Sequence, residues 1–170
     1  LLDGVDRVAA GLAARGIGRL VTRDVEPVPG AFPCPVSVYL APDVAGEACP
    51  VFGGRLIRGV GNGSSPQWLQ DRLKAIGLRP ISALVDITNF FTFALNRPLH
   101  VFDADKVAGG VLRIHPAAGG EELLALDGKT YALRAGQMAI SDASGVESLA
   151  GIMGGEHSGC TEATVNVFFE

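Results

Sequence analysis

Apolar positions along the first third of the chain follow two different periods. In residues 3–14 they recur at helical spacing, and Gly16 supplies a helix stop. The stretch from 27 to 35 contains four prolines, which excludes helix interior there. Residues 36–40 and 55–60 alternate between apolar and polar side chains, and this pattern predicts strands.

Two further helices are predicted between residues 64 and 96. The Ser-Ser-Pro segment at 64–66 is typical of a helix start, because serine caps free amides and proline at the first helical position loses no hydrogen bond. An apolar face then continues to Gly77, which ends the helix. The next helix covers residues 83–95 and ends at Asn96, just before an Arg-Pro pair.

The second half of the chain changes to short alternating runs that predict strands. These runs cover residues 111–114, 122–126, 130–133, 138–140 and 165–168. Asp127-Gly128 is a hairpin-turn signal, and the glycine-rich residues 151–155 predict a loop where backbone can approach a ligand closely. The pattern therefore predicts an α+β fold with mixed or antiparallel sheets, two or three helices and two interlocked subdomains.

Composition supports a packed domain and limits the class of partner. Hydrophobic residues make up 48% of the 170 residues and charged residues 19%, which is enough to build a core. No apolar run approaches the roughly 20 residues that a membrane-spanning helix needs. The net charge of -4 argues against a protein that holds a long nucleic-acid backbone by itself, although a local pocket can still receive a short nucleic-acid end.

Cysteine and histidine spacing predicts neither a disulfide nor a structural metal. Cys34, Cys49 and Cys160 are odd in number and far apart, as expected for reduced thiols in the cytosol. His157 and Cys160 offer two metal ligands, whereas a structural zinc site needs about four.

Polar residues interrupt two otherwise apolar segments. Thr88 and Asn89 lie within the predicted helix 83–95, where their side chains compete for backbone hydrogen bonds. His100 lies in the segment that follows. On the pattern alone, capping or buried structural hydrogen bonds are favoured over a functional site, and both alternatives stay open.

Six motifs in a fixed order carry a resemblance to a known family. They are SPQWL at 65–69, GLRPI at 77–81, VDITN at 85–89, RPLHVFD at 97–103, LDG at 126–128 and AGIMGG at 150–155. In this order and spacing they resemble the central region, formed by the third and fourth domains, of the bacterial phenylalanyl-tRNA synthetase β subunit. The whole of residues 1–170 is similar to this module, and residues 64–170 match it best.

The resemblance implies an editing site that hydrolyses tyrosyl-tRNA carrying the phenylalanine anticodon, with water as the nucleophile. It implies a catalytic set of Thr88, Asn89 and His100, and a substrate-binding set of Ala150, Gly151 and Glu170. The implied task of Glu170 is to recognise the tyrosine hydroxyl. A synthetic pocket that is merely hydrophobic rejects an added hydroxyl only about a hundredfold, so a second pocket that requires the hydroxyl is needed.

The resemblance also implies the partners, which are the 3′ end of phenylalanine tRNA and the synthetase α subunit in an α2β2 assembly in the cytoplasm. It implies no cofactor and no metal in this segment, because ATP and magnesium belong to the whole enzyme. With a net charge of -4 the chain alone should bind tRNA weakly. Two alternatives remain: a structural, tRNA-docking domain that is inactive alone, and a stand-alone relative that edits in trans.

Overall fold

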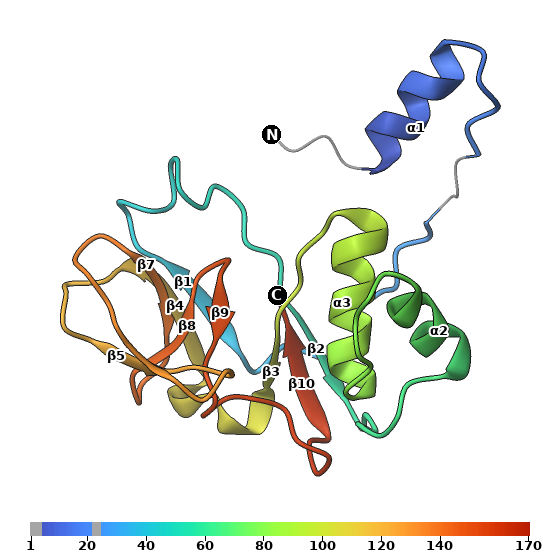
Figure 1. Cartoon of the computed structure of the whole chain (residues 1–170). Coiled ribbons are helices and arrows are strands. Elements are labelled where there is room, and N and C mark those ends of the chain that lie inside the picture. Colours follow the sequence, from blue (N-terminus) through green and yellow to red (C-terminus); the bar gives the residue numbers. More distant parts are fainter. Residues whose placement is uncertain (1–4, 22–24) are drawn as a thin grey trace.

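The computed structural model describes residues 5–21 and 25–170, and it begins with a helix that stands apart from both sheets (Figure 1). Helix α1 (Val5–Ala14) is followed by Gly16 at a φ of 74°, as predicted. The predicted start of this helix at residue 3 lies outside the described residues. Val8 and Leu12 on α1 are 56% and 44% exposed, so these two apolar side chains are not packed into the core.

Two helices that contact each other lie beside a small sheet (Figure 1). They are α2 (Gln67–Ala75) and α3 (Ala83–Leu95). The bounds of α3 confirm the prediction, and Asn96 adopts the left-handed conformation (φ 52°) from which its N–H caps the carbonyl of Phe91. Leu84 of α3 packs against Val101 and Val167 of the sheet. No helix among the described residues is long and apolar enough to cross a membrane.

The predicted serine cap of α2 is wrong. The capping residue is Pro66, and no side chain bonds the first amides of the helix. The hydroxyl of Ser65 donates instead to a carboxylate oxygen of Asp86 on α3, and both residues are buried. Asp86 also accepts a hydrogen bond from the N–H of Ile81 at 2.9 Å. A buried carboxylate needs these donors more than an exposed helix end needs a cap, so the tertiary bond prevails.

The small sheet has three antiparallel strands in the order β2-β10-β3. They are β2 (Arg55–Arg58), β3 (Val101–Asp103) and β10 (Asn166–Phe169). The central strand β10 buries Val167 and Phe168 completely. Sequence reasoning missed β3 because its three residues are all buried and therefore show no alternation.

The large sheet has five strands in the order β1-β4-β7-β8-β9, in which only the β1–β4 pair is parallel. Its strands are β1 (Ser37–Leu40), β4 (Val111–Pro116), β7 (Met138–Ser141), β8 (Val146–Leu149) and β9 (Met153–Gly154). A separate hairpin joins β5 (Glu122–Leu124) to β6 (Thr130–Ala132) through the predicted turn at Gly128, whose φ is 76°. Strands β8 and β9 were not predicted.

The chain passes repeatedly between the two sheets, which confirms the interlocked α+β architecture. It supplies β1 to the large sheet, β2 and β3 to the small sheet, β4 and β7–β9 to the large sheet, and finally β10 to the small sheet. Short 3₁₀ turns η1 (Ala104–Lys106) and η2 (Ala108–Gly110) make the crossing after β3. One hydrophobic cluster accordingly joins Phe102 and Phe168 to Leu112 and Ile140.

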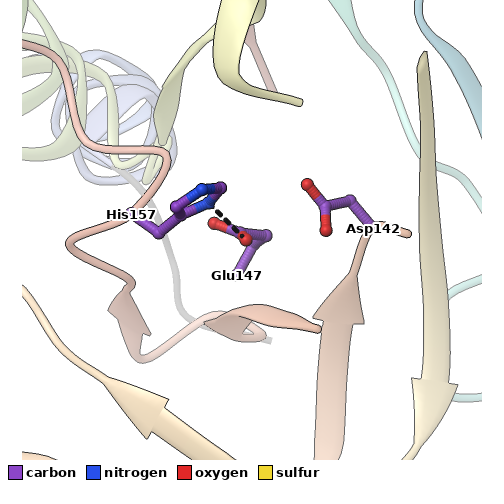
Figure 2. A group of neighbouring side chains, drawn as sticks. All are labelled: Asp142, Glu147 and His157. Carbon is purple, nitrogen blue, oxygen red and sulfur yellow. Dashed lines mark hydrogen bonds and ion pairs between the residues drawn. The ribbon is translucent and has the colours of Figure 1, made fainter. Parts of the chain in front are cut away.

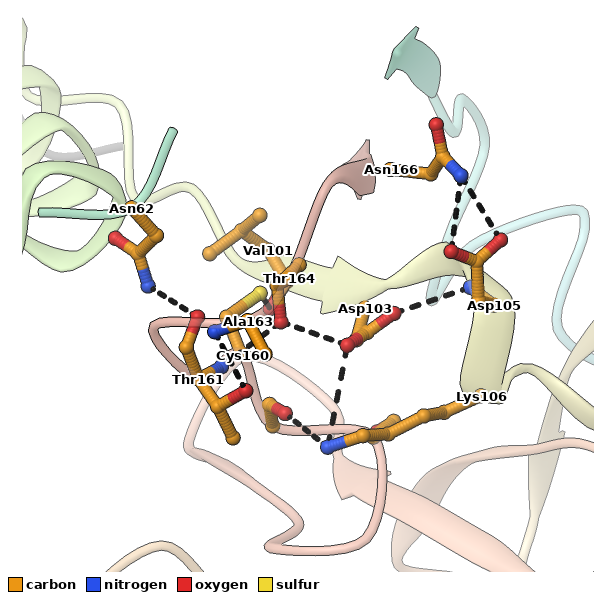
Figure 3. A network of polar contacts seen from close by, with 12 residues as sticks. Asn62, Val101, Asp103, Asp105, Lys106, Cys160, Thr161, Ala163, Thr164 and Asn166 are labelled. Carbon is orange, nitrogen blue, oxygen red and sulfur yellow. Dashed lines mark hydrogen bonds and ion pairs between the residues drawn. The ribbon is translucent and has the colours of Figure 1, made fainter. Parts of the chain in front are cut away.

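A polar network fixes the loop that leads into β10 (Figure 3). The buried carboxylate of Asp103 accepts a hydrogen bond from the hydroxyl of Thr164 at 2.7 Å, and Lys106 donates to the carbonyl of Gly159 at 2.7 Å. The side-chain amide of Asn62 donates to the carbonyl of Thr161 at 3.0 Å. These bonds hold the start of β10, and hence the residues at its far end, in register with β3.

Candidate functional site

His100 and Glu170 lie opposite each other just beyond the paired ends of β3 and β10. The N–H of Glu170 donates to the carbonyl of His100 at 3.0 Å, and the N–H of His100 donates back at 3.3 Å. Residues directly opposite in an antiparallel pair project their side chains from the same face, with Cβ atoms roughly 5 Å apart. Backbone pairing therefore brings together two titratable side chains that are distant in sequence.

A pocket of about 160 Å³ lies where these two residues face the turn between β8 and β9. It is lined by residues 98–100, 148, 151–154 and 170. The hydroxyl of Ser148 donates to the carbonyl of Met153 at 3.1 Å and closes the β8–β9 turn that forms one wall. The pocket thus lies between the β8–β9 turn of the large sheet and the residues beside the ends of β3 and β10 in the small sheet.

The ring of His100 is held in place by two contacts. Gly154 lies so close that a Cβ atom built on it would fall 2.7 Å from Nε2 of His100 and closer still to Cε1. On β3 the ring of Phe102 meets the imidazole edge to face, with centroids 4.5 Å apart and planes at 86°. The absence of a side chain at residue 154 therefore determines where the imidazole can lie.

The side chains of His100 and Glu170, which both line this pocket, each carry a buried polar atom. Among the described residues, Nε2 of His100 and Oε2 of Glu170 are buried and have no hydrogen-bond partner. Burial lowers the pKa of His100 to about 4 and raises the pKa of Glu170 to about 7. The imidazole is therefore neutral at physiological pH, and the carboxyl group titrates near neutral pH. Unpartnered buried groups are costly, and a ligand that pairs with them recovers that cost.

The remaining predicted site residues are divided between the pocket and its surroundings. Gly151 lines the pocket with a φ of 71°, so His100, Gly151 and Glu170 are brought together. Ala150 does not line it and packs instead against the main hydrophobic cluster. Thr88 and Asn89 lie on α3 and do not line the pocket either; the hydroxyl of Thr88 donates to the carbonyl of Val85 at 2.8 Å.

A second cluster of titratable groups lies on or just after strands β7, β8 and β9 of the large sheet (Figure 2). It consists of Asp142, Glu147 and His157. Its ligand atoms all lie within 4.8 Å of one another, and no sequence motif indicated it. Nδ1 of His157 contacts Oε1 of Glu147 at 2.8 Å. His157 therefore pairs with a carboxylate and not with Cys160. The thiol of Cys160 lies against the carbonyl of Val101, and its pKa is raised to about 11, chiefly by burial.

The four carboxylate oxygens of this second cluster already have partners. Asp142 accepts hydrogen bonds from the N–H groups of Ala108, Ser144 and Gly145. Glu147 accepts from the N–H of Ser158 at 3.1 Å and from the Ser144 hydroxyl at 3.2 Å. The hydroxyl of Ser158 itself is buried without a partner among the described residues. These hydrogen bonds hold the surrounding loops in place, so we assign the cluster a structural role.

Comparison with known proteins places this fold and pocket in a family. The model of the B3/4 domain matches residues 48–170, and this span contains both sheets except β1 and every residue that lines the 160 Å³ pocket. The chain therefore belongs to the B3/4 domain family.

The similar full-length proteins are phenylalanine–tRNA ligase β subunits. The chain is 68% identical over 167 residues to that of Cereibacter sphaeroides and 62% identical over 169 residues to that of Paramagnetospirillum magneticum, each match covering 98% of this chain. The chain spans about a fifth of the length of these relatives (21% of each). An N-terminal fragment of the phenylalanyl-tRNA synthetase β subunit from Pyrococcus horikoshii shares the fold, with a TM-score of 0.56 and 17% identity over 98% of this chain and 50% of that fragment.

Proposed function

We propose that the 160 Å³ pocket receives the tyrosine side chain of mischarged tyrosyl-tRNA and that the site hydrolyses its ester bond. One observation carries this proposal: His100 and Glu170 both line the pocket, and each carries a buried polar atom without a partner among the described residues. The similarity to phenylalanine–tRNA ligase β subunits supports an aminoacylated tRNA as the substrate. The tRNA 3′ end, the α subunit, and the ATP and magnesium of the complete enzyme belong to the same proposal.

Glu170 discriminates tyrosine from phenylalanine because its buried Oε2 lacks a hydrogen-bond partner. A tyrosine ring in the pocket gives Oε2 of Glu170 a hydroxyl to bond, whether the carboxyl group is ionised or protonated. Phenylalanine leaves the same buried oxygen unpaired, at a cost of about 1–3 kcal/mol. Gly151 lines the pocket without a side chain and has no atom within 4 Å of where its Cβ would lie, so an aromatic ring can approach backbone there.

His100 acts on the ester that both amino acids share. Hydrolysis needs a water oxygen to attack the carbonyl carbon while the ester C–O bond breaks and the departing ribose hydroxyl gains a proton. A base is most effective when its pKa lies near the working pH, and the pKa of His100 is about 4. We therefore assign to its Nε2 the positioning of the water or the ester by hydrogen bonding, and not proton abstraction.

Replacing Glu170 by Ala tests this proposal. Tyrosine loses a hydrogen bond to the carboxyl group, which is worth about 1.5–3 kcal/mol when that group is ionised, or roughly a ten- to hundredfold loss in kcat/KM for Tyr-tRNA. Phenylalanine never makes this bond, so deacylation of Phe-tRNA should hold or improve. The measurement is deacylation of both substrates by a protein that extends beyond residue 170.

Glu156→Ala is the matched control, because Glu156 is exposed and lies outside the pocket. It should leave the Tyr-over-Phe preference unchanged. Equal losses on both substrates for Glu170→Ala would assign this residue to the fold or the chemistry and not to specificity. A wild-type protein that does not deacylate Tyr-tRNA would contradict the editing proposal and favour a docking role.

A further inference from the structure

The residues that line the 160 Å³ pocket differ widely in how much of their surface meets solvent. Ser148 is only 3% exposed, whereas Ile152, in the turn between β8 and β9, is 73% exposed. Ile152 is also the one large, exposed apolar residue of the described chain that lines this pocket. Ser148 therefore belongs to the buried wall, and Ile152 lies at the rim, next to solvent.

The backbone of Ile152 is fixed although its side chain is in water. Its N–H donates to the carbonyl of Leu149 at 2.9 Å and closes the β8–β9 turn. Gly151 permits this turn with a φ of 71°, and β8 pairs with β9 directly beside it. The N–H of Leu126 also donates to the carbonyl of Gly154 at 3.0 Å, which ties β9 to the segment after β5. The side chain of Ile152 is therefore presented from a rigid support.

The turn itself does not require an isoleucine, because the bond that residue 152 makes there is a backbone bond. Single exposed apolar residues are common on proteins, so exposure alone carries no argument. Here the exposed side chain lies on the wall of a pocket whose other side includes Pro98 and Leu99, which are also apolar. A ring that enters the pocket passes between these residues and Ile152. Covering Ile152 with that ring removes apolar surface from water, which strengthens binding.

We propose that Ile152 binds the aromatic ring of the esterified amino acid and supplies an affinity that tyrosine and phenylalanine share. In the proposed complex Glu170 reads the hydroxyl, whereas Ile152 contacts carbon atoms that both rings possess. An apolar contact with the ring does not change while the ester reacts, so it is equally strong in the ground state and the transition state. Ile152 therefore sets KM for both substrates, and neither kcat nor the preference between them. This inference rests on the proposed function.

The test uses the full-length protein that contains this sequence, purified with the subunits that accompany it. Ile152→Ser should raise KM about five- to tenfold for Tyr-tRNA and Phe-tRNA alike, and leave both kcat values within about twofold. Ile152→Val retains most of the apolar surface and should keep KM within about twofold of the wild type. Because the side chain is exposed, neither variant should change the urea midpoint of unfolding.

Val165→Ser is the matched control, because Val165 is also β-branched and is 50% exposed but does not line the pocket. It should leave KM, kcat and the urea midpoint unchanged. A larger loss for Tyr-tRNA than for Phe-tRNA in Ile152→Ser would overturn the inference, since the contact would then depend on the hydroxyl. An unchanged KM for both substrates, or a raised KM together with a lower urea midpoint, would overturn it as well.

Binding of L-tyrosinamide separates this inference from the proposed function. The whole enzyme is titrated with this compound while a phenylalanyl-adenylate analogue occupies its aminoacylation site. If the wild type binds L-tyrosinamide without deacylating Tyr-tRNA, and Ile152→Ser weakens that binding about five- to tenfold, the ring contact stands without the editing function. If the wild type deacylates Tyr-tRNA, and Ile152→Ser neither raises KM nor weakens L-tyrosinamide binding, the ring contact is wrong and the editing function remains.

Discussion

Two histidine–glutamate pairs in this chain are built from the same residue types and are used in opposite ways. In the Glu147–His157 pair the side chains contact each other at 2.8 Å, and the carboxylate also accepts a backbone N–H. In the His100–Glu170 pair only the backbones are bonded to each other, and Nε2 and Oε2 have no partner among the described residues. The first pair closes a loop, whereas the second leaves two buried polar atoms that a ligand could pair with, as the proposed function requires.

The difference teaches that residue type alone does not identify a site in this fold. A buried carboxylate whose oxygens already hold amide hydrogens contributes to stability, and pairing it with a ligand would require breaking those bonds. A buried carboxyl oxygen without a partner weakens the empty protein and strengthens the complex. The two pairs should therefore respond in opposite ways to substitution, one in stability and the other in activity.

The largest expected effect comes from removing the histidine of the His100–Glu170 pair. His100→Ala should lower kcat for deacylation of Tyr-tRNA about a hundredfold, because a misplaced water or ester carbonyl costs roughly that factor. Phe-tRNA should lose the same factor, since His100 acts on the shared ester. His157→Ala, at a side chain that is 61% exposed, should leave both rates within about twofold. Similar losses for the two variants would remove the distinction between the pairs.

A smaller effect, on the free energy of unfolding, is expected when Glu147 of the Glu147–His157 pair is removed. Glu147→Ala leaves the buried N–H of Ser158 without its acceptor, which should lower the free energy of unfolding by about 1–3 kcal/mol. Urea unfolding followed by intrinsic fluorescence measures this change. Glu156→Ala, at an exposed position, is the control and should stay within about 0.5 kcal/mol of the wild type. A neutral Glu147→Ala would show that the loop is held by other bonds.

Gly154→Ala should disturb the His100–Glu170 pair without removing either side chain. The added Cβ would fall 2.7 Å from Nε2 of His100, so the imidazole must move. We expect kcat for Tyr-tRNA to fall about tenfold while KM changes little, because the ring is displaced and not deleted. Gly61→Ala is a control, since a Cβ there meets no atom within 4 Å. Wild-type kcat in Gly154→Ala would mean that the position of the ring is unimportant.

Local signals in the sequence were sufficient for much of the fold. The bounds of α3 and the hairpin at Gly128 follow from residues within the elements themselves. The serine cap failed because Ser65 found a buried partner, Asp86, twenty-one positions away. Strand β3 was missed because burial on both faces removes alternation. In each failure a tertiary contact outweighed the local preference.

The sequence likewise predicted only part of the candidate site. The family resemblance indicated His100, Gly151 and Glu170, which the fold brings to one pocket. It also indicated Thr88, Asn89 and Ala150, which do not line that pocket. The constraint that Gly154 places on the His100 ring, and the pairing of Glu147 with His157, exist only once the β8–β9 turn is folded. No periodicity or spacing in the sequence encodes such contacts.

The smallest expected effect concerns the pH dependence of discrimination. The pKa of Glu170 is about 7, so the group is mostly protonated at pH 6 and mostly ionised at pH 8. A hydrogen bond from the tyrosine hydroxyl to a carboxylate is worth about 1 kcal/mol more than one to a neutral carboxyl group. The ratio of kcat/KM for Tyr-tRNA over Phe-tRNA should therefore rise about three- to fourfold from pH 6 to pH 8.

Taking the ratio of the two substrates removes the effects of pH on the ester itself, because hydroxide attacks the same bond in both. His100 adds no change in this range, since its pKa of about 4 keeps the imidazole neutral throughout. Glu170→Gln retains an uncharged hydrogen-bonding group at every pH, so its ratio should stay flat between pH 6 and pH 8. A rise that persists in Glu170→Gln would assign the titration to another group and leave discrimination by Glu170 independent of its charge.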